Sequence, residues 1–168
     1  AVDANGQGEA RRIAGALREA GRVVREKKGA TLLDMGDGVL LMETHSPKSA
    51  IGNDIIYMCR AAAEELASGK WKGLVIGART ENFCVGANVA IMLLEAQEEE
   101  WDELELMARE FQNAFMGLKF APKPVVVAPY GLTLGGGYEL CAVGDRVVAA
   151  AESYIGLVEV GVGVIPGA

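Results

Sequence analysis

The sequence predicts an α/β protein whose binding site lies in loops that follow buried strands. Short apolar runs alternate along the chain with longer segments whose apolar residues recur at helical spacing. Such alternation favours helices packed on a largely parallel sheet. The chain has 168 residues, of which 51% are hydrophobic and 23% charged, which is enough for one domain with a real core. Its 22 glycines predict many tight turns or close backbone approaches.

Residues 1–30 are predicted to be a linker followed by an amphipathic helix. The helix is expected over residues 9–28, where Ile13, Leu17, Ala20 and Val24 recur at helical spacing. Its other face carries arginines and lysines, a pattern typical of a solvated face. Residues 31–168 are then expected to form the core domain.

Two strands and a helix open this core domain. The runs "ATLLDMG" and "VLLMET" predict neighbouring strands joined by a glycine-containing turn. The segment "SPKSAIGND" is expected to be a loop, with Asn53 capping the helix that follows. That helix places its apolar residues on one face, namely Ile55, Cys59, Ala62 and Leu66. The run "GLVIGA" then predicts a buried strand, and "RTENFCVGAN" a loop that leaves its end.

The second half continues the same alternation. A short helix, "VAIMLLEA", precedes a longer one over residues 98–118. The longer helix is predicted to bury Trp101, Leu104, Ala108, Phe111, Phe115 and Leu118. The strand "KPVVVAPYG" leads to three glycines in "TLGGGYEL". The last predicted elements are a buried helix in "YELCAVG", a strand in "DRVVAA", and a strand plus loop in "SYIGLVEVGVGVIPG".

Charge and composition exclude several classes of protein. A net charge of -7 argues against a nucleic-acid-binding protein, which needs a basic surface to neutralise phosphates. The three cysteines match no zinc or redox spacing, so we expect reduced thiols and a cytoplasmic protein. Scattered carboxylates suggest no metal site, and no apolar stretch is long enough to predict a membrane span. The chain has no initiator methionine and stops at "VIPGA", so we expect a piece of a longer protein, truncated at its C-terminus.

Two glycine-containing loops are the strongest candidates for chemistry. The spacing in "LGGGYE" fits neither phosphate-binding fingerprint, and a serine hydrolase is disfavoured because His45 is the single histidine. If the strands before "NFCVGAN" and "LGGGYE" are neighbours, both loops open on one edge of the sheet. Gly136 then begins a helix, and its N–H together with that of Cys84 forms a two-donor oxyanion hole.

Three motifs carry a resemblance to a known family. In their order and spacing, "FCVGAN", "GGGYEL" and "IGLVEVGVGVIPGA" closely resemble the enoyl-CoA hydratase/isomerase (crotonase) superfamily, from about residue 31 to the end. The resemblance implies a crotonase-like ββα superhelix that binds acyl-CoA thioesters and assembles as a trimer or a dimer of trimers. The wording "ARTENFCVGAN" is also similar to the hydratase portion of bacterial multifunctional 3-hydroxyacyl-CoA dehydrogenases. A fusion to such a dehydrogenase domain is therefore expected.

The resemblance also implies roles for individual residues. Cys84 and Gly136 match the two positions whose N–H groups hold the thioester oxygen, and Glu139 and Glu159 match the paired glutamates of the hydratases. Substrate-binding positions carried over from the family are Lys48, Ser49, Ala50, Gly86, Ala87 and Gly135. The chain departs from the family where Asn88 replaces a frequent aspartate and Val158 a frequent proline.

Together these observations predict an enoyl-CoA hydratase of fatty-acid β-oxidation. It adds water to a trans-2-enoyl-CoA to give the 3-hydroxyacyl-CoA. Glu139 holds and deprotonates the water and Glu159 delivers the α-proton. No cofactor is expected, because CoA arrives with the substrate. The alternatives are a Δ3–Δ2 enoyl-CoA isomerase and a non-catalytic fragment that binds acyl-CoA. Two simpler interpretations of the glutamates also stay open: Glu139 as a helix residue paired with Arg146, and Glu159 as a surface charge.

Overall fold

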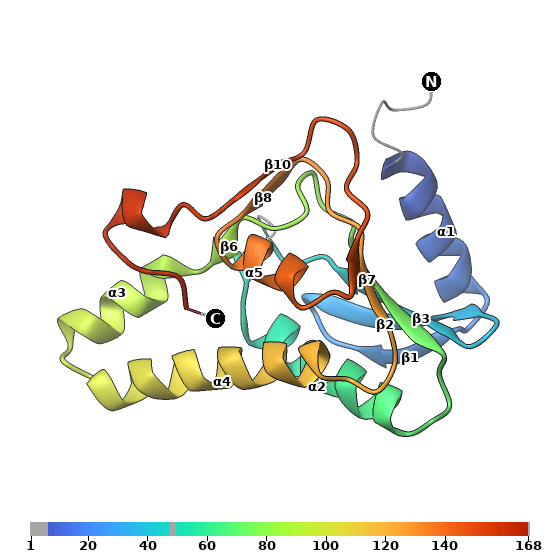
Figure 1. The fold of residues 1–168 in the computed structure, drawn as a ribbon, viewed down its shortest axis with the longest axis horizontal. Helices are drawn as coiled ribbons and strands as arrows, with labels where there is room; N and C mark the ends of the chain where they lie inside the picture. Colours follow the sequence, from blue (N-terminus) through green and yellow to red (C-terminus); the bar gives the residue numbers. More distant parts are fainter. Residues whose placement is uncertain (1–6, 48–49, 168) are drawn as a thin grey trace.

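The molecule is built on a six-stranded sheet with helices on both sides (Figure 1). The computed structural model describes residues 7–47 and 50–167. The strands lie in the order β1-β2-β3-β5-β7-β9. Their bounds are β1 Val23–Glu26, β2 Ala30–Gly36, β3 Val39–Thr44, β5 Gly73–Ala78, β7 Val125–Val127 and β9 Arg146–Val147. The β1–β2 and β2–β3 pairs are antiparallel, and every pair from β3 onward is parallel, which confirms the predicted α/β class.

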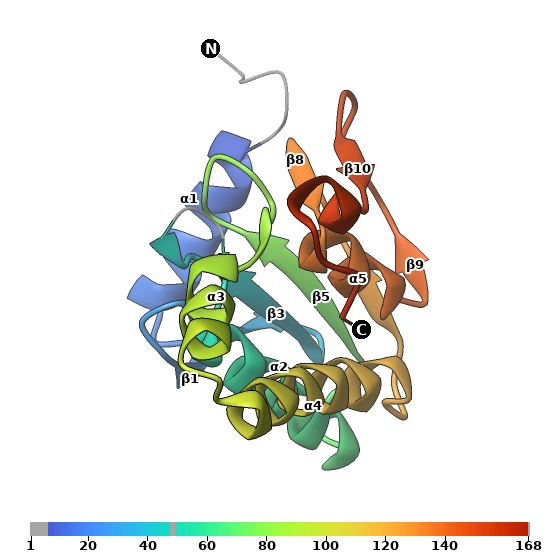
Figure 2. The same ribbon diagram turned by 90° about the vertical axis from the view of Figure 1, so that its left-hand side faces the viewer.

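The apolar face predicted around Ile55, Cys59, Ala62 and Leu66 is buried, whereas Ile13 of the first helix is exposed and the helix at residues 89–97 buries no side chain. The bounds of the helices are α1 Gln7–Glu19, α2 Asn53–Ala67, α3 Val89–Gln97, α4 Trp101–Lys119 and α5 Gly136–Ala142, with a 3-10 turn at Glu159–Val162. Figures 1 and 2 show α2 and α4 side by side along one face of the sheet, with α1 on the opposite side. Four consecutive residues of β2, 30–33, are buried, as expected for a strand covered on both faces.

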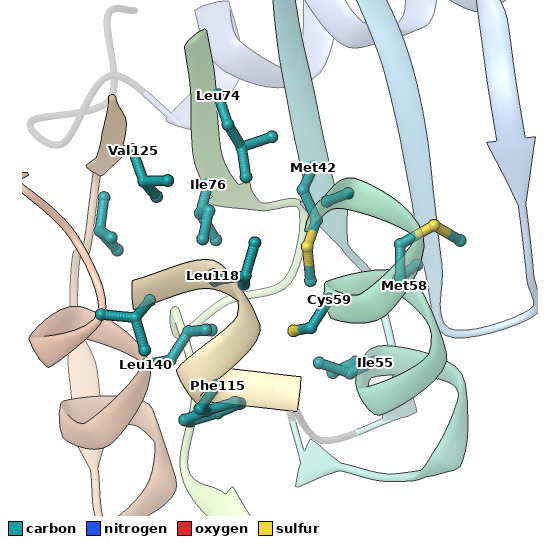
Figure 3. Packing of buried hydrophobic residues seen from close by; sticks show 14 of the residues in the cluster. Met42, Ile55, Met58, Cys59, Leu74, Ile76, Phe115, Leu118, Val125 and Leu140 are labelled. Atoms are coloured by element: carbon teal, nitrogen blue, oxygen red, sulfur yellow. The ribbon is translucent and has the colours of Figure 1, made fainter. Parts of the chain in front are cut away.

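The main core lies between the sheet and the two long helices. Figure 3 shows Met42 and Ile76 of the sheet facing Cys59 of α2 and Leu118 of α4. Leu140 of α5 reaches the same cluster, so the helix after the three glycines is part of the core. All three cysteines are buried and free.

Two small parallel sheets join the loops at the carboxyl end of the main sheet. β4, Ala50–Ile51, pairs with β6, Gly86–Ala87. β8, Leu132–Leu134, pairs with β10, Tyr154–Gly156, and an isolated bridge links Cys84 to Thr133. Strands of two or three residues have no period that a sequence can display, so β4 and β6 were expected to be loop and β8 was not predicted.

The predicted N-terminal helix is too long. It ends at Glu19, because Gly21 follows in the left-handed conformation with φ +70° and stops the helix. The chain then forms β1, which pairs with β2 in the main sheet. Arg18 forms an ion pair with the buried Glu43 of β3, so α1 is anchored to the sheet. The predicted boundary after residue 30 thus falls inside β2, one residue after this partner of β1 begins.

Two further expectations about helices need correction. Asn53 is the first residue of α2, and Gly52 occupies the N-cap with no side-chain hydrogen bond. Trp101 is 62% exposed, and the buried face of α4 starts only at Phe111. The reason is that the first turns of α4 extend beyond the sheet and contact α3 (Figure 1). Asn88, by contrast, does cap α3, accepting from Ala90 N at 3.3 Å.

No helix in the described part of the chain is both long and apolar enough to cross a membrane.

Phe115 should carry a large share of the packing of α4. Its side chain is 1% exposed and stacks on Phe111, with ring centroids 4.3 Å apart. We expect Phe115→Ala to lower the free energy of unfolding by about 3–5 kcal/mol, because the cavity cannot fully collapse. The matched control is Phe120→Ala, since Phe120 is 79% exposed and its loss should change stability by less than about 0.5 kcal/mol. Urea titration followed by circular dichroism measures both; equal effects would contradict this view of the core.

Candidate functional site

Three segments that lie far apart in the sequence meet beside the first turn of α5. Leu134 N donates to Cys84 O at 2.9 Å, which joins the loop after β5 to β8. Gly135 N donates to Gly156 O at 2.9 Å, which joins β10 to the same strand end. Figure 1 shows β6, β8, β10 and α5 gathered above α4. The structure therefore brings together the three motifs that sequence analysis singled out.

At each of the three glycines before Tyr138 an added Cβ would force a neighbouring group to move. Gly135 has φ +56°, and a Cβ atom there would lie 2.8 Å from Glu159 Oε1. A Cβ at Gly136 would lie 2.9 Å from Ile51 Cδ1, and one at Gly137 only 2.5 Å from the carbonyl oxygen of Cys84. Gly137 thus closes the contact between two loops, whereas Gly135 and Gly136 border the carboxylates described below.

Gly136 presents a backbone donor at this junction. It is the first residue of α5, as predicted, and a residue at this position has no acceptor one turn earlier within its helix. Gly86 packs against it, because a Cβ at Gly86 would lie 3.5 Å from Gly136 N. The short strand β6, formed by Gly86 and Ala87, therefore runs along the same side of the site as the Gly136 N–H.

The predicted role of Cys84 as the second donor is wrong. Its N–H already donates to Leu132 O at 3.2 Å, because Cys84 is bridged to β8. The side chain is 3% exposed, and burial raises the pKa of the thiol to about 11, so a thiolate nucleophile is also disfavoured. The backbone that lies beside Gly136 is that of Gly86 and Ala87, which the sequence had assigned only to substrate binding.

The two predicted glutamates lie next to neighbouring glycines. Glu139 is 7% exposed, and its Oε1 accepts from Gly167 N at 2.9 Å. Its Oε2 is on the side of Gly136, 3.5 Å from the place of a Cβ on that residue. Glu159 is half-buried, and its Oε1 lies against Gly135. The two carboxylates thus border two consecutive backbone positions, although two strands, β9 and β10, lie between Glu139 and Glu159 in the sequence.

Val158 gives Glu159 a contact that a proline would not allow. Val158 N donates to Glu159 Oε2 at 2.8 Å, so the second carboxylate, like the first, is held by one backbone N–H. Sequence reasoning treated this replacement as a departure from the family and missed the hydrogen bond. The missing signal was available, since proline is the residue without an N–H to donate.

A cavity of about 180 Å³ opens beside Glu139. Apart from Glu139 and Lys119, its lining is apolar or aromatic. The lining residues are Phe115, Met116, Lys119, Tyr138, Glu139, Ala142, Val143, Leu157 and Pro166. Lys119 Nζ donates to the carbonyl oxygen of Ala142 at 2.8 Å, which places its charge at the end of α5. Glu139 is the predicted site residue in this lining, so one of the two carboxyl groups borders a mainly apolar space.

The remaining predicted substrate-binding residues have mixed outcomes. Ala50 lies in β4, paired with Gly86, so it borders the site from the other side of β6. Lys48 and Ser49 lie outside the described residues. Within residues 7–47 and 50–167, no three His, Cys, Asp or Glu side chains are grouped to hold a metal ion.

Comparison with known proteins identifies the family. Residues 34–168 match the family model described as enoyl-CoA hydratase/isomerase. This chain belongs to that family. Its fold is the crotonase fold, as shown by an enoyl-CoA hydratase structure from Geobacillus kaustophilus with a TM-score of 0.74. That superposition covers 85% of this chain and 54% of the other at 21% sequence identity. At this identity it shows the fold alone.

Two curated relatives show which named proteins this chain resembles. A Bacillus subtilis protein named "Probable 3-hydroxyacyl-CoA dehydrogenase" is 50% identical over 152 residues, which are 90% of this chain but 19% of that protein. A "Crotonyl-CoA hydratase" of Syntrophomonas wolfei is 36% identical over 99 residues, 56% of this chain and 35% of that protein. The chain thus spans about a fifth of the Bacillus relative and a third of the Syntrophomonas one.

We expect the thiols of this hydratase/isomerase-family chain to be unreactive in the folded state. Burial raises the pKa of Cys59 and Cys141 to about 12 and that of Cys84 to about 11, so at pH 8 the thiolate is scarcely populated. Unfolding lowers these pKa values toward about 8.5 and exposes the sulfur. Titration with a thiol-disulfide reagent at pH 8 should label no cysteine in buffer and three in denaturant. Rapid labelling of Cys84 in buffer would show that the contact between Gly137 and the loop carrying Cys84 opens.

The close contact between Gly137 and the Cys84 carbonyl is called the seam below. Gly137 and Gly117 offer a matched test of it. An alanine at Gly137 would press its Cβ into the Cys84 carbonyl, so we expect Gly137→Ala to destabilise the protein by at least about 2 kcal/mol. Gly117 lies in the interior of α4, 3.7 Å from Ala63 by the same measure, so Gly117→Ala should stabilise by about 0.5–1 kcal/mol. Thermal unfolding of the two variants should therefore shift in opposite directions. A harmless Gly137→Ala would mean that the two loops are not in contact.

Proposed function

We propose that this chain carries the hydratase chemistry of its family, adding water to a trans-2-enoyl-CoA to give a 3-hydroxyacyl-CoA. The observation that carries the proposal is the placement of Glu139 and Glu159 against neighbouring residues, Gly136 and Gly135. Each carboxylate has one oxygen held by a backbone N–H and the other on the side of the glycines. Adding water across a double bond needs a base at one carbon and an acid at the next, and two carboxylates can supply both.

In this proposal the thioester oxygen is bound by main-chain donors. The Gly136 N–H is one donor, and the N–H of Ala87 in the adjoining strand β6 is the other, because the N–H of Gly86 already donates to Cys84 Sγ at 3.5 Å. Such donors stabilise the negative charge that develops on the oxygen as an enolate forms, and each is worth about 3–4 kcal/mol of activation free energy in enzymes of this kind. Glycine at positions 135 and 136 lets Glu159 and Ile51 pack directly against the backbone beside this donor, where a Cβ would collide with them.

The proton transfers then follow from the two glutamates. Glu139, ionised, takes a proton from water while the water oxygen bonds to the β-carbon. The electron pair of the double bond moves toward the thioester oxygen. The α-carbon collects a proton from Glu159, which begins the cycle protonated. The two carboxyl groups exchange protonation states over the reaction, and a proton returned from Glu139 to Glu159 through solvent resets them.

The cavity and the relatives support a proposal for the substrate class and for the domain fused to this chain. The apolar space beside Glu139 suits a fatty-acyl tail, which supports a substrate of fatty-acid β-oxidation. The Bacillus relative, of which this chain covers 19%, is named a 3-hydroxyacyl-CoA dehydrogenase, and that supports a fusion to a domain that oxidises the product. A homo-trimeric or dimer-of-trimers assembly, a cytoplasmic location and independence of metal or redox cofactors complete the proposal. The free, buried cysteines are compatible with a reducing compartment.

Replacing either glutamate by glutamine should remove hydration without unfolding the protein. We expect Glu139→Gln and Glu159→Gln each to lower kcat with crotonyl-CoA by about 10²–10⁴-fold, because each deletes a positioned proton-transfer group. The matched control is Glu103→Gln on the exposed start of α4, which should leave kcat unchanged. Formation of 3-hydroxybutyryl-CoA, followed by mass spectrometry as a gain of one water, measures all of them.

Other outcomes of this experiment separate the alternatives. If only one glutamate is needed and a 3-enoyl-CoA is converted to the 2-enoyl isomer, the chain is an isomerase. If the wild-type protein binds crotonyl-CoA but leaves it unchanged, the chain is a binding unit. Release of free CoA would indicate a hydrolase and contradict the paired-glutamate mechanism.

A further inference from the structure

Gln112 is connected to the Glu139 carboxylate by two consecutive hydrogen bonds. Gln112 lies on α4, and its Nε2 donates to the carbonyl oxygen of Gly167 at 2.7 Å. Gly167 N in turn donates to Glu139 Oε1 at 2.9 Å. The amide of Gln112 thus reaches the proposed base through one residue of another segment, without touching the carboxylate itself.

Residues 164–167 lead from the backbone of Glu159 to the carboxylate of Glu139. Val164 N donates to the carbonyl oxygen of Glu159 at 3.1 Å, which fixes the start of residues 164–167 to the second glutamate. The other end of the segment is held at Gly167 by Gln112 and Glu139. Ile165, in the middle, is 81% exposed, so little burial holds the segment in place. Hydrogen bonds at its two ends therefore determine where the Gly167 N–H points.

The helix that carries Gln112 is a rigid reference for the site. Phe111, the preceding residue of α4, is buried, and its Cζ is 3.3 Å from the position of a Cβ on Gly136. Two consecutive residues of one helix therefore contact opposite parts of the site: Phe111 packs on the backbone donor and Gln112 fixes the residue that holds the base. A displacement of Gly167 relative to α4 would move Glu139 relative to Gly136.

We propose that Gln112 is a positioning residue for the hydration reaction. Its amide holds Gly167 so that the Gly167 N–H keeps the Glu139 carboxylate aimed at the water. The proposal rests on the hydratase function proposed above. It assigns Gln112 an effect on turnover and none on substrate binding, because its side chain is exposed on α4 and contacts the last described residue of the segment.

The test compares three variants of the full-length protein with crotonyl-CoA. Gln112→Met keeps the length of the side chain and removes the donor, and we expect kcat to fall about fivefold, the value of one neutral hydrogen bond, with KM and Tm unchanged. Gln112→Lys restores an N–H donor of similar reach and should return kcat to within about twofold of the wild type. Asn113→Met places the same side chain at the next exposed position of α4 and should have no effect.

The results can contradict the inference in distinct ways. Equal kcat for wild type and Gln112→Met overturns the positioning role while leaving the hydratase function intact. A fall in kcat accompanied by a lower Tm and a higher KM, and not rescued by Gln112→Lys, shows a structural role and also overturns it. A wild-type protein that fails to hydrate crotonyl-CoA overturns the proposed function and this inference together.

Discussion

The close contact between Gly137 and Cys84 is the constraint on which the site depends. The carbonyl oxygen of Cys84 lies where a Cβ on residue 137 would have to be, so the first turn of α5 can press directly against the loop after β5. That contact places β8 beside Cys84, and β8 in turn provides the edge on which β10 pairs. The turn that follows β10 then brings Glu159 to Gly135. A side chain at residue 137 would therefore push the first turn of α5 away from the loop after β5.

The two carboxylates are held in different surroundings by the same kind of contact. Glu139 belongs to a helix that is part of the core, and it is nearly inaccessible to solvent. Glu159 begins a short 3-10 turn on an otherwise exposed segment. Because a buried carboxylate needs hydrogen-bond partners, a backbone N–H at each site both satisfies and orients the group.

The sequence predicted the long elements because their apolar periods are repeated several times. β2, β3, α2, β5, α3 and α4 are found where the pattern places them. It failed where a local or tertiary effect decides: Gly21 ends α1, and the reach of the sheet decides that Phe111, and not Trp101, begins the buried face of α4. Periodicity reveals which face of a helix is apolar, but it does not reveal which turns have a neighbour.

The candidate site, too, was predicted where the information is local and missed where it depends on folding. Short motifs located the three loops, since glycine and glutamate at fixed spacing are visible in one chain. They could not show whether the N–H of Cys84 is available, because its acceptor, Leu132, is 48 residues further along the sequence and is brought near only by folding. The link from Gln112 to Gly167 has the same character, joining positions 55 residues apart. Identities of residues are local information, whereas hydrogen-bond partners are not.

These contacts give the residues of the "FCVGAN" and "GGGYEL" motifs different structural roles. Cys84 and Gly137 close the seam: one needs a small side chain and a carbonyl facing α5, and the other needs no side chain at all. Gly86 and Gly136 lie one step to the side of that seam and pack against each other, since a Cβ at Gly86 would lie 3.5 Å from Gly136 N. Glu139, the proposed base, comes two residues after Gly137 on the same short helix. In the proposed mechanism, a substitution at the seam acts on the chemistry through position, whereas one at Gly136 or Glu139 acts on the reacting groups themselves.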